Sequence, residues 1–368
     1  MKIVLIEPYF SGSHKSWASG LKLYSKHKIE IISLPGKYWK WRMRGGAITL
    51  ANNFMQMNYK PDLILATDML DLTTFLSLTR QRSSKIPVAI YFHENQFSYP
   101  WSKNDRESQK KRDLNYGFIN IKSALVADHV LFNSKYHNKS FQNEGLKYLK
   151  NFPDHNELDV MNKIEKKSEV LYLGMDLSRF DKYKNVKKST PLILWNHRWE
   201  YDKNPEPFFR ALFKLKDEDI AFKVALLGES FNSKPDIFLE AKKILKNQIV
   251  HYGYCNDFSE YAKWVWMADI LPVTSNQDFF GGSVVESMYC DTYPLLPNRL
   301  TYPELLPNAL HSKHIYSNYD DFYINLKKCV LAIEETREFS QKKLFIPYDW
   351  KNIITHYDSL FESFIASD

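Results

Sequence analysis

The chain has 368 residues, of which 44% are hydrophobic and 25% charged, and its formal net charge is +7. This length is too great for one ordinary α/β domain and favours two domains of roughly 150–190 residues each. The composition is that of a soluble globular protein, and no apolar run of 18 residues predicts a membrane-spanning helix. The first seven residues predict a short strand ending on Glu7 rather than a signal peptide.

The cysteine content indicates the redox compartment of the protein, and the net charge indicates which classes of partner it can bind. Cys255, Cys290 and Cys329 lack the close spacing of a zinc site or a disulfide framework, so we expect a reduced, cytoplasmic setting. The basic charge fits either a lysine-rich proteome or a polyanionic partner such as RNA. With 9 Trp, 23 Tyr and 24 Phe, the chain also has many rings on which unpaired bases can stack.

The first half of the chain alternates predicted strands with predicted helices. Strands are predicted over residues 2–6, 29–34, 63–66, 88–92, 129–132 and 169–173, and helices over 15–25, 49–57, 72–82, 112–127, 134–143 and 154–165. This rhythm predicts βαβ units and a mostly parallel sheet. Residues 182–190 are polar and basic without periodicity, and we predict that they form the interdomain linker.

The second half repeats the alternation. Its predicted strands cover residues 192–195, 223–227, 249–252, 270–273, 293–296 and 314–316, and its helices 205–215, 235–245, 258–267, 283–290, 320–335 and 350–363. We therefore predict an α/β fold of two doubly wound, Rossmann-like domains facing a central cleft. The domains would span residues 1–181 and 191–349, and a final helix within 350–368 would pack back toward the N-terminal domain.

The first candidate site follows the first predicted strand. Here Ser11, Gly12 and Ser13 precede a predicted helix. Gly12 would let an anion or a sugar hydroxyl approach the backbone, and ligands bind at the carboxyl ends of the strands in such sheets. The alternative is an ordinary helix N-cap.

Residues 35–46 form a second candidate segment, both basic and aromatic. Its cations and rings are Lys37, Tyr38, Trp39, Lys40, Trp41, Arg42 and Arg44, with no acid among them. Cations for phosphates and flat rings for unpaired bases are what single-stranded RNA recognition needs, so we interpret this loop as an acceptor- or RNA-binding element. A structural amphipathic loop and a membrane-surface contact are the alternatives.

His93, Glu94 and Asn95 follow the fourth predicted strand. Phe97 stands where the zinc motif HExxH needs its second histidine, so this is not that motif. We expect His93 to contact a sugar or to stabilise charge, and Glu94 and Asn95 to contact the acceptor. A structural histidine is the alternative.

In the second half, Arg198 and Lys203 follow the predicted strand 192–195 and precede a helix start at Asn204-Pro205. The planar fork of an arginine and the point charge of a lysine suit a diphosphate whose negative charge grows as it leaves. An exposed, solvated pair of cations is the alternative.

The most informative stretch is residues 278–286. Gly281, Gly282 and Ser283 offer backbone N–H groups at a helix start, which is a favourable place for a phosphate. Glu286 lies one helical turn further and can accept hydrogen bonds from two ribose hydroxyls, and Asp278 lies before the glycines. Together with the two cations, this pattern predicts a nucleotide-diphosphate pocket whose occupant is a sugar nucleotide.

These motifs resemble a known family. Asp278 and Glu286 resemble the E-x7-E motif of family-4 GT-B glycosyltransferases, with Asp278 where Glu is usual. The stretches EPYFSGSHKSW, LPGKYWKWRMRGGAITLA, YFHENQFSYP, WNHRWEYDKNPEPFF and FFGGSVVESMYCDTYPLLPNRLTYPE resemble the tRNA-queuosine α-mannosyltransferase family over nearly the whole chain.

The resemblance implies GT-B architecture, GDP-mannose as donor and the cyclopentene-diol of queuosine in a tRNA anticodon as acceptor. It also implies retaining transfer without a metal or another cofactor, in which the leaving diphosphate helps to deprotonate the acceptor. Asp68 and Asp71 are then interpreted as a helix cap and its first turn rather than a metal motif. The alternatives are a GT-B enzyme that acts on a lipid-linked or surface glycan and a non-catalytic RNA-binding protein, and the number of subunits stays open.

Overall fold

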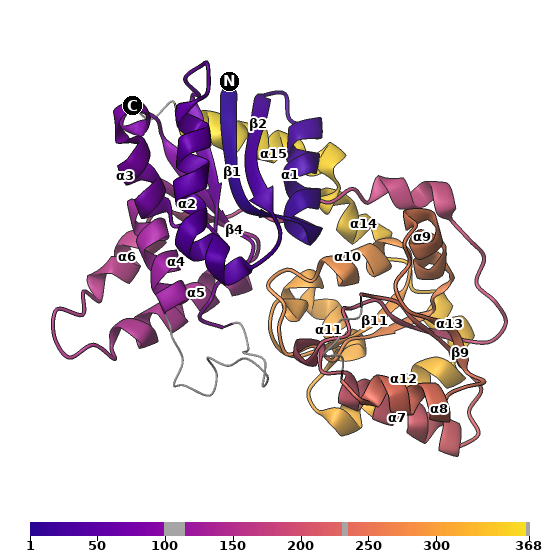
Figure 1. Cartoon of the computed structure of the whole chain (residues 1–368). Coiled ribbons are helices and arrows are strands. Elements are labelled where there is room, and N and C mark those ends of the chain that lie inside the picture. The colour runs from indigo at the N-terminus through magenta and orange to yellow at the C-terminus, as the bar shows by residue number, and fades with distance from the viewer. Residues whose placement is uncertain (99–114, 230–234, 366–368) are drawn as a thin grey trace. The chain divides into compact units, whose positions relative to one another are not determined.

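The computed structural model describes residues 1–98, 115–229 and 235–365, and the chain divides into two compact units (Figure 1). The first unit comprises Met1–Asp176 together with Tyr348–Asp368, and the second comprises Leu177–Pro347. Residues 182–190, predicted as the linker, therefore lie inside the second unit. There the ammonium group of Lys187 donates hydrogen bonds to the carbonyl oxygens of Ala268 and Asp291.

The first unit is built on a parallel sheet of order β2-β1-β3-β4-β5-β6. Its strands are β1 (Lys2–Phe10), β2 (Lys28–Pro35), β3 (Leu63–Thr67), β4 (Val88–Phe92), β5 (His129–Phe132) and β6 (Ser168–Val170). The order reverses between β1 and β3, and such a switch point is where open α/β sheets bind ligands.

Helices cover both faces of this sheet, because alternate residues of each strand point to opposite sides. They are α1 (Gly12–Tyr24), α2 (Trp39–Met55), α3 (Leu72–Ser83), α4 (Asn115–Val126), α5 (Lys135–Leu149), α6 (Asp159–Glu165) and α15 (Trp350–Ser363). Val4 and Ile6 of β1 belong to the apolar core that includes residues of α2 and α3, whereas Ile3 and Leu5 belong to the core that includes residues of α1 and α15. The first unit is therefore doubly wound, as predicted.

The C-terminal helix α15 is an integral part of the first unit. Trp350 is almost fully buried, and a Cβ at Gly20 of α1 would come within 2.0 Å of its indole nitrogen. The indole of Trp17 donates a hydrogen bond of 3.1 Å to the Tyr357 hydroxyl, and Ser25 donates one of 2.5 Å to Asp358. Buried aromatic rings and polar bonds thus join segments more than 300 residues apart in the chain.

The segment 37–44, predicted as a loop, proves to be largely helical, because α2 begins at Trp39 and continues past Gly45. The ring of Trp41 lies against Gly45, where a Cβ would come within 2.7 Å of it, and Arg42 Nε donates to the carbonyl of Pro35. These local contacts, one of them between residues four apart on the same helix, accompany a helix that the glycines at 45 and 46 do not break. The prediction of a loop was therefore wrong.

The second unit has a parallel sheet of order β12-β11-β10-β7-β8-β9. Its strands are β7 (Leu192–Trp195), β8 (Lys223–Leu226), β9 (Ile249–Tyr252), β10 (Ile270–Pro272), β11 (Tyr293–Pro297) and β12 (Ile315–Tyr316). Counted within the unit, this order is the Rossmann order 3-2-1-4-5-6, with its switch point between β7 and β10.

The helices of this unit are α7 (Pro205–Asp217), α8 (Ile237–Ile244), α9 (Phe258–Met267), α10 (Gly282–Tyr289), α11 (Asn308–His314), α12 (Tyr319–Leu331), α13 (Ile333–Arg337) and α14 (Lys342–Phe345). Short 3₁₀ helices η1 (Ser178–Tyr183), η2 (Tyr201–Lys203), η3 (Tyr302–Leu305) and η4 (Ile346–Tyr348) connect elements. Cys255, Cys290 and Cys329 are all buried, and none of them forms a disulfide. Within the described ranges, no helix is long and apolar enough to cross a lipid bilayer.

Candidate functional site

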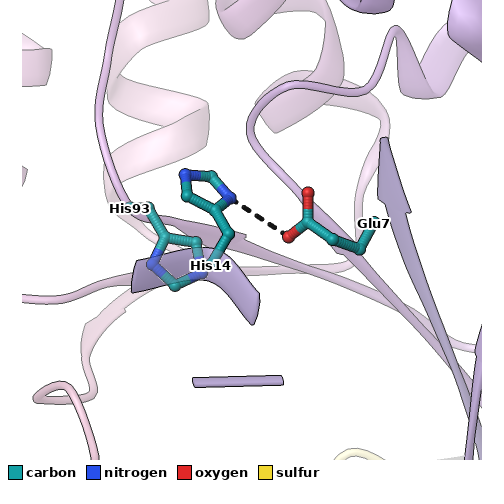
Figure 2. Close-up of side chains that lie close together, drawn as sticks. All are labelled: Glu7, His14 and His93. Atoms are coloured by element: carbon teal, nitrogen blue, oxygen red, sulfur yellow. Dashed lines mark hydrogen bonds and ion pairs between the residues drawn. The ribbon is translucent and has the colours of Figure 1, made fainter. Parts of the chain in front are cut away.

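The switch point of the first unit carries a buried cluster of ionisable side chains (Figure 2). His14, the third residue of α1, lies 3.1 Å by its Nδ1 from Oε2 of Glu7, and both side chains are buried. The second carboxylate oxygen of Glu7 accepts the backbone N–H of Tyr9 at 2.7 Å. The imidazole of His93, which follows β4, lies beside that of His14 with ring centroids 4.1 Å apart.

Burial and the neighbouring charges determine which side chains of this cluster are protonated at neutral pH. Burial opposes protonation of the imidazole, but nearby carboxylates, chiefly that of Glu7, raise the pKa of His14 to about 9. Burial and the positive charge of His14 lower the pKa of His93 well below its usual value. Burial also raises the pKa of Asp68 to about 8, although the charge of His14 opposes this. At neutral pH the cluster therefore holds one imidazolium, on His14, next to a neutral imidazole.

His93 is held by its backbone, and its ring nitrogen is left for a ligand. Its N–H donates to Asp68 at 2.8 Å, and its carbonyl accepts from the Asn133 amide at 2.9 Å. Nε2 of His93 is buried and has no hydrogen-bond partner in the structure. A buried nitrogen without a partner costs free energy unless a ligand or water satisfies it, so this atom is the best candidate in the first unit for a ligand contact.

The other residues of the first unit that we predict to contact a ligand differ in their burial and in their hydrogen bonds. Asn95 uses its side-chain oxygen to accept the backbone N–H groups of Phe97 and Ser98, so it shapes the turn after β4. Glu94 is half-buried and accepts from the Gln96 amide at 2.8 Å. Gly12 begins α1 with a φ of +51°, and a Cβ there would meet no atom within 4 Å. Space for a ligand therefore exists at Gly12.

The basic and aromatic residues of 37–44 divide into exposed and packed groups. Tyr38 and Trp41 are 77% and 62% exposed. Trp39 is half-buried against Tyr116, with ring centroids 5.1 Å apart, and the Arg44 guanidinium lies 5.0 Å from the same ring. No acidic residue occurs between positions 30 and 62, so this part of the sequence is basic.

In the second unit, the structure brings Arg198 and Lys203 together after β7. Both cations approach one oxygen of the buried Asp202, at 3.6 and 3.7 Å. Arg198 also pairs with Glu200 at 2.9 Å and keeps 44% of its side chain exposed. A buried acid thus holds two positive charges at the end of a central strand, which suits a diphosphate.

Asp278 lies between these cations and α10. Its Oδ1 accepts the N–H of Gly281 at 3.1 Å, and its Oδ2 accepts from the Tyr302 hydroxyl at 2.9 Å and from Lys203 at 3.3 Å. Burial opposes its charged form, but the ammonium group of Lys203 is the main cause that lowers the pKa of Asp278. The carboxylate therefore braces the turn before α10 and orients Lys203.

Glu286 lies on the second turn of α10. Its Oε2 accepts a hydrogen bond of 2.6 Å from the Tyr261 hydroxyl of α9, and burial raises the pKa of Glu286. The amide of Asn196, directly after β7, donates at 2.9 Å to the carbonyl of Ser283 and to the hydroxyl of Ser287. These bonds fix α10 against the end of β7, so Gly281, Gly282 and Ser283 lie at the switch point with Arg198 and Lys203.

The sequence reasoning missed several residues of these two clusters. Glu7 and His14 pair in the first, and His197, Tyr261 and Tyr302 complete the second. The signal that could have found these polar residues is their place at the carboxyl end of a strand, because Glu7 lies near the end of β1, His14 in the first turn of the helix that follows, and His197 just after β7. No local signal marks Tyr261, since a tyrosine on a helix is usually part of the core.

Among the residues that the structure describes, two groups have the spacing to hold a metal ion. The ligand atoms of Glu7, His14 and His93 lie within 4.8 Å of one another, as do those of His251, Cys255 and Glu260. In the first group the Nδ1 of His14 is engaged by Glu7. In the second, burial raises the pKa of Cys255 to about 11, which disfavours the thiolate that binds metal.

Two family models match the chain in turn. Residues 2–175 match the model described as "tRNA-queuosine alpha-mannosyltransferase N-terminal", and residues 178–338 match "Glycosyl transferases group 1". These ranges correspond to the two structural units. The tRNA-queuosine alpha-mannosyltransferase of Drosophila melanogaster is 32% identical over 385 aligned residues, which cover 100% of this chain and 98% of that protein.

Solved structures share the fold at low sequence identity. HepE from Anabaena in complex with UDP superposes with a TM-score of 0.68 at 14% identity, covering 99% of this chain and 100% of that one. Sucrose-phosphate synthase from Thermosynechococcus elongatus gives 0.70 at 13% identity, with 100% of both chains covered. The N-terminal domain of Candida albicans trehalose-6-phosphate phosphatase gives 0.73 at 11% identity over 99% of this chain and 97% of that one. These similarities confirm the predicted GT-B fold class.

Proposed function

Because the chain belongs to the tRNA-queuosine alpha-mannosyltransferase family, we propose that this glycosyltransferase moves mannose from GDP-mannose to queuosine in a tRNA anticodon. The observation that carries the proposal is the 32% identity to the Drosophila enzyme along the whole chain. Both units take part in that match, so the proposal does not depend on a shared fold, which alone does not specify a substrate. Nucleotide sugar and tRNA are the partners, and the compartment is the cytoplasm.

Arg198 and Lys203 would bind the donor's diphosphate. Their shared approach to Asp202 supports this role, because it holds two cations at one strand end. The N–H groups of Gly282 and Ser283 at the start of α10 add a favourable dipole for phosphate, whereas that of Gly281 donates to Asp278. As the bond to mannose breaks, charge grows on the leaving diphosphate, and donors already in place stabilise that charge most.

Glu286 would accept hydrogen bonds from the ribose hydroxyls of the donor. Tyr261 supports this role because its hydroxyl fixes one carboxylate oxygen and leaves lone pairs on the other. Asp278 would lie beside the sugar while orienting Lys203. Its carboxylate already accepts three protein donors, so its contribution to the sugar is smaller than that of a longer, less engaged Glu.

The protonation states of the first unit favour the leaving diphosphate as the base. His14 already carries its proton at neutral pH, so it cannot accept another from the acceptor hydroxyl. The lowered pKa of His93 makes this imidazole a weak base. We therefore assign His93 to a hydrogen bond with the sugar, and the acceptor proton to an oxygen of the departing diphosphate. No metal or other cofactor is needed for this sequence of steps.

The acceptor would bind the first unit. The cations Lys37, Lys40, Arg42 and Arg44 would contact tRNA phosphates, and Trp39 and Trp41 would help to bind unpaired bases. Glu94 and Asn95 would contact the acceptor, and Gly12 would contact the donor. The acid-free stretch between positions 30 and 62 supports this assignment, since repulsion of phosphate is absent along it.

The test is a transfer assay that compares two acceptors and three donors. One tRNA carries queuosine and its control carries guanosine at the same position, and GDP-mannose is compared with UDP-glucose and ADP-glucose. We expect transfer only with GDP-mannose and the queuosine tRNA, unchanged by EDTA. Transfer from another donor, or equal transfer to the guanosine tRNA, would replace the proposed substrates, and loss of activity in EDTA would replace the metal-free mechanism.

A further inference from the structure

His197 is a buried histidine at the switch point of the second unit, between β7 and the cation Arg198. It is 3% exposed. The indole N–H of Trp195 donates to its carbonyl at 2.9 Å, and Gly228, with a φ of +108°, packs so closely that a Cβ there would come within 2.0 Å of the same oxygen. The backbone of His197 is therefore rigidly placed, and its ring has a defined position.

One nitrogen of this ring is bonded and the other is not. Nδ1 of His197 lies 3.0 Å from the hydroxyl of Ser283, the second residue of α10. Nε2 is buried and has no hydrogen-bond partner in the structure. A polar atom that is held rigidly, buried and unpaired is unusual in a folded protein, and a missing ligand or water is the common reason.

Nearby charges indicate what that ligand is. Burial and the ammonium group of Lys203 lower the pKa of His197 to about 3, although Asp278 opposes the change, so the ring is neutral at neutral pH. We assign the Ser283 hydroxyl as the donor to Nδ1, so that the neutral ring carries its hydrogen on Nε2 and can donate it. Lys203 and the N-terminus of α10 favour an anion beside this N–H.

We propose that the Nε2–H of His197 donates a hydrogen bond to a phosphate oxygen of the nucleoside diphosphate, as a third group beside Arg198 and Lys203. The inference rests on the proposed function and adds a donor contact to it. A neutral N–H supplies this bond without adding a third positive charge to a site that already contains two cations. Ser283 then has two roles, because its backbone N–H lies at the helix start and its hydroxyl selects the histidine tautomer.

The variants separate the two ring nitrogens. The amide of His197→Gln can place a donor near the position of Nε2, whereas that of His197→Asn reaches the position of Nδ1. We measure the affinity of the wild type and of both variants, together with His197→Ala, for GDP, guanosine and inorganic diphosphate by calorimetry. His251→Ala is the matched control, since it removes another histidine of the same unit, at β9.

We expect His197→Ala and His197→Asn to weaken binding of GDP and of inorganic diphosphate about tenfold or more, as for a lost hydrogen bond to a charged group. Guanosine affinity should stay unchanged, and His197→Gln should recover part of the loss. Equal losses for GDP and guanosine, no recovery by Gln, or no loss at all would overturn the proposal. Melting temperatures identify any variant that fails to fold. If His197→Ala does not fold, the proposal is tested by comparing the diphosphate affinities of His197→Gln and His197→Asn.

The wild type is also titrated with UDP. This titration distinguishes an error in the proposed donor nucleotide from an error in the role proposed for His197. If the nucleobase is wrong, the wild type prefers UDP to GDP. The binding of inorganic diphosphate by the wild type and the variants then still tests the role of His197. A wrong role for His197 appears as unaltered diphosphate binding in the variants. A wild type that binds none of these ligands would overturn both proposals.

Discussion

Replacing Glu7 by Gln removes the charge that keeps His14 protonated while preserving the size of the side chain. The folded protein raises the pKa of His14 from 6.5 to about 9, so the folded state holds this proton more tightly than the unfolded chain. The resulting stabilisation is fully present below pH 6.5 and is lost as the pH rises through about 9. Between pH 6.5 and pH 8.5 the wild type should lose about 2 kcal/mol of unfolding free energy from this group.

In Glu7→Gln the same loss should be largely absent. Burial lowers the pKa of His14, and without the Glu7 carboxylate to oppose this effect the imidazole should be neutral across this pH range. Asp68, whose raised pKa also makes stability fall as the pH rises through about 8, interacts with the charges of both Glu7 and His14, so the difference between the two proteins reports on the cluster of Glu7, His14 and Asp68 as a whole. The buried cysteines add little below pH 8.5, since a free thiol ionises mainly above that pH.

The assay is urea unfolding at pH 6.5 and pH 8.5 of the wild type, Glu7→Gln and the control Glu30→Gln. Tryptophan fluorescence reports on the first unit through the buried Trp17 and Trp350, and hydrogen exchange of the β1 amides distinguishes its unfolding from that of the second unit. An equal pH dependence in the wild type and Glu7→Gln would show that His14 is not held as an imidazolium, and the argument against His14 as a base would fail with it.

Four further predictions concern the rest of the molecule. Arg198→Ala should lower turnover by ~10²-fold in the transfer assay, with a smaller change in the affinity for GDP-mannose, because it acts on charge that develops during the reaction. Glu286→Ala should weaken the binding of GDP-mannose about tenfold or more in calorimetry at an unaltered melting temperature; an unchanged affinity would refute the ribose assignment. Arg42→Ala combined with Arg44→Ala should lower tRNA affinity and make the slope of log K against log salt shallower by roughly 1.5–2, and an unchanged slope would mean that these cations do not contact phosphates. Trp350→Ala should destabilise the first unit by about 3–5 kcal/mol in urea unfolding, and a cost of less than about 1 kcal/mol would mean that α15 contributes little to its core.

Much of the fold could be predicted because its signals are local. Apolar runs such as Ile3–Ile6 and Leu63–Ala66, each followed by an amphipathic stretch, predict parallel strands buried on both faces. The polar residues after those runs, among them His93 and Arg198, could be placed at strand ends for the same reason. The prediction was wrong for residues 37–44, because cations and aromatic rings without an apolar periodicity were interpreted as a loop, whereas α2 begins at Trp39.

The class of the fold, the family and the strand ends that carry ligand-binding groups could be predicted from the residues alone, because periodicity and motif spacing are properties of neighbouring residues. Which of those strand ends lie next to each other depends on the strand order of the folded sheet. The strand order places β10 beside β7, so Asp278 reaches Lys203 across 75 residues of chain, and Tyr302 completes the contact. The protonation of His14 and the unpaired Nε2 of His197 were likewise decided by folding, because both depend on burial and on charges brought close by residues distant in sequence.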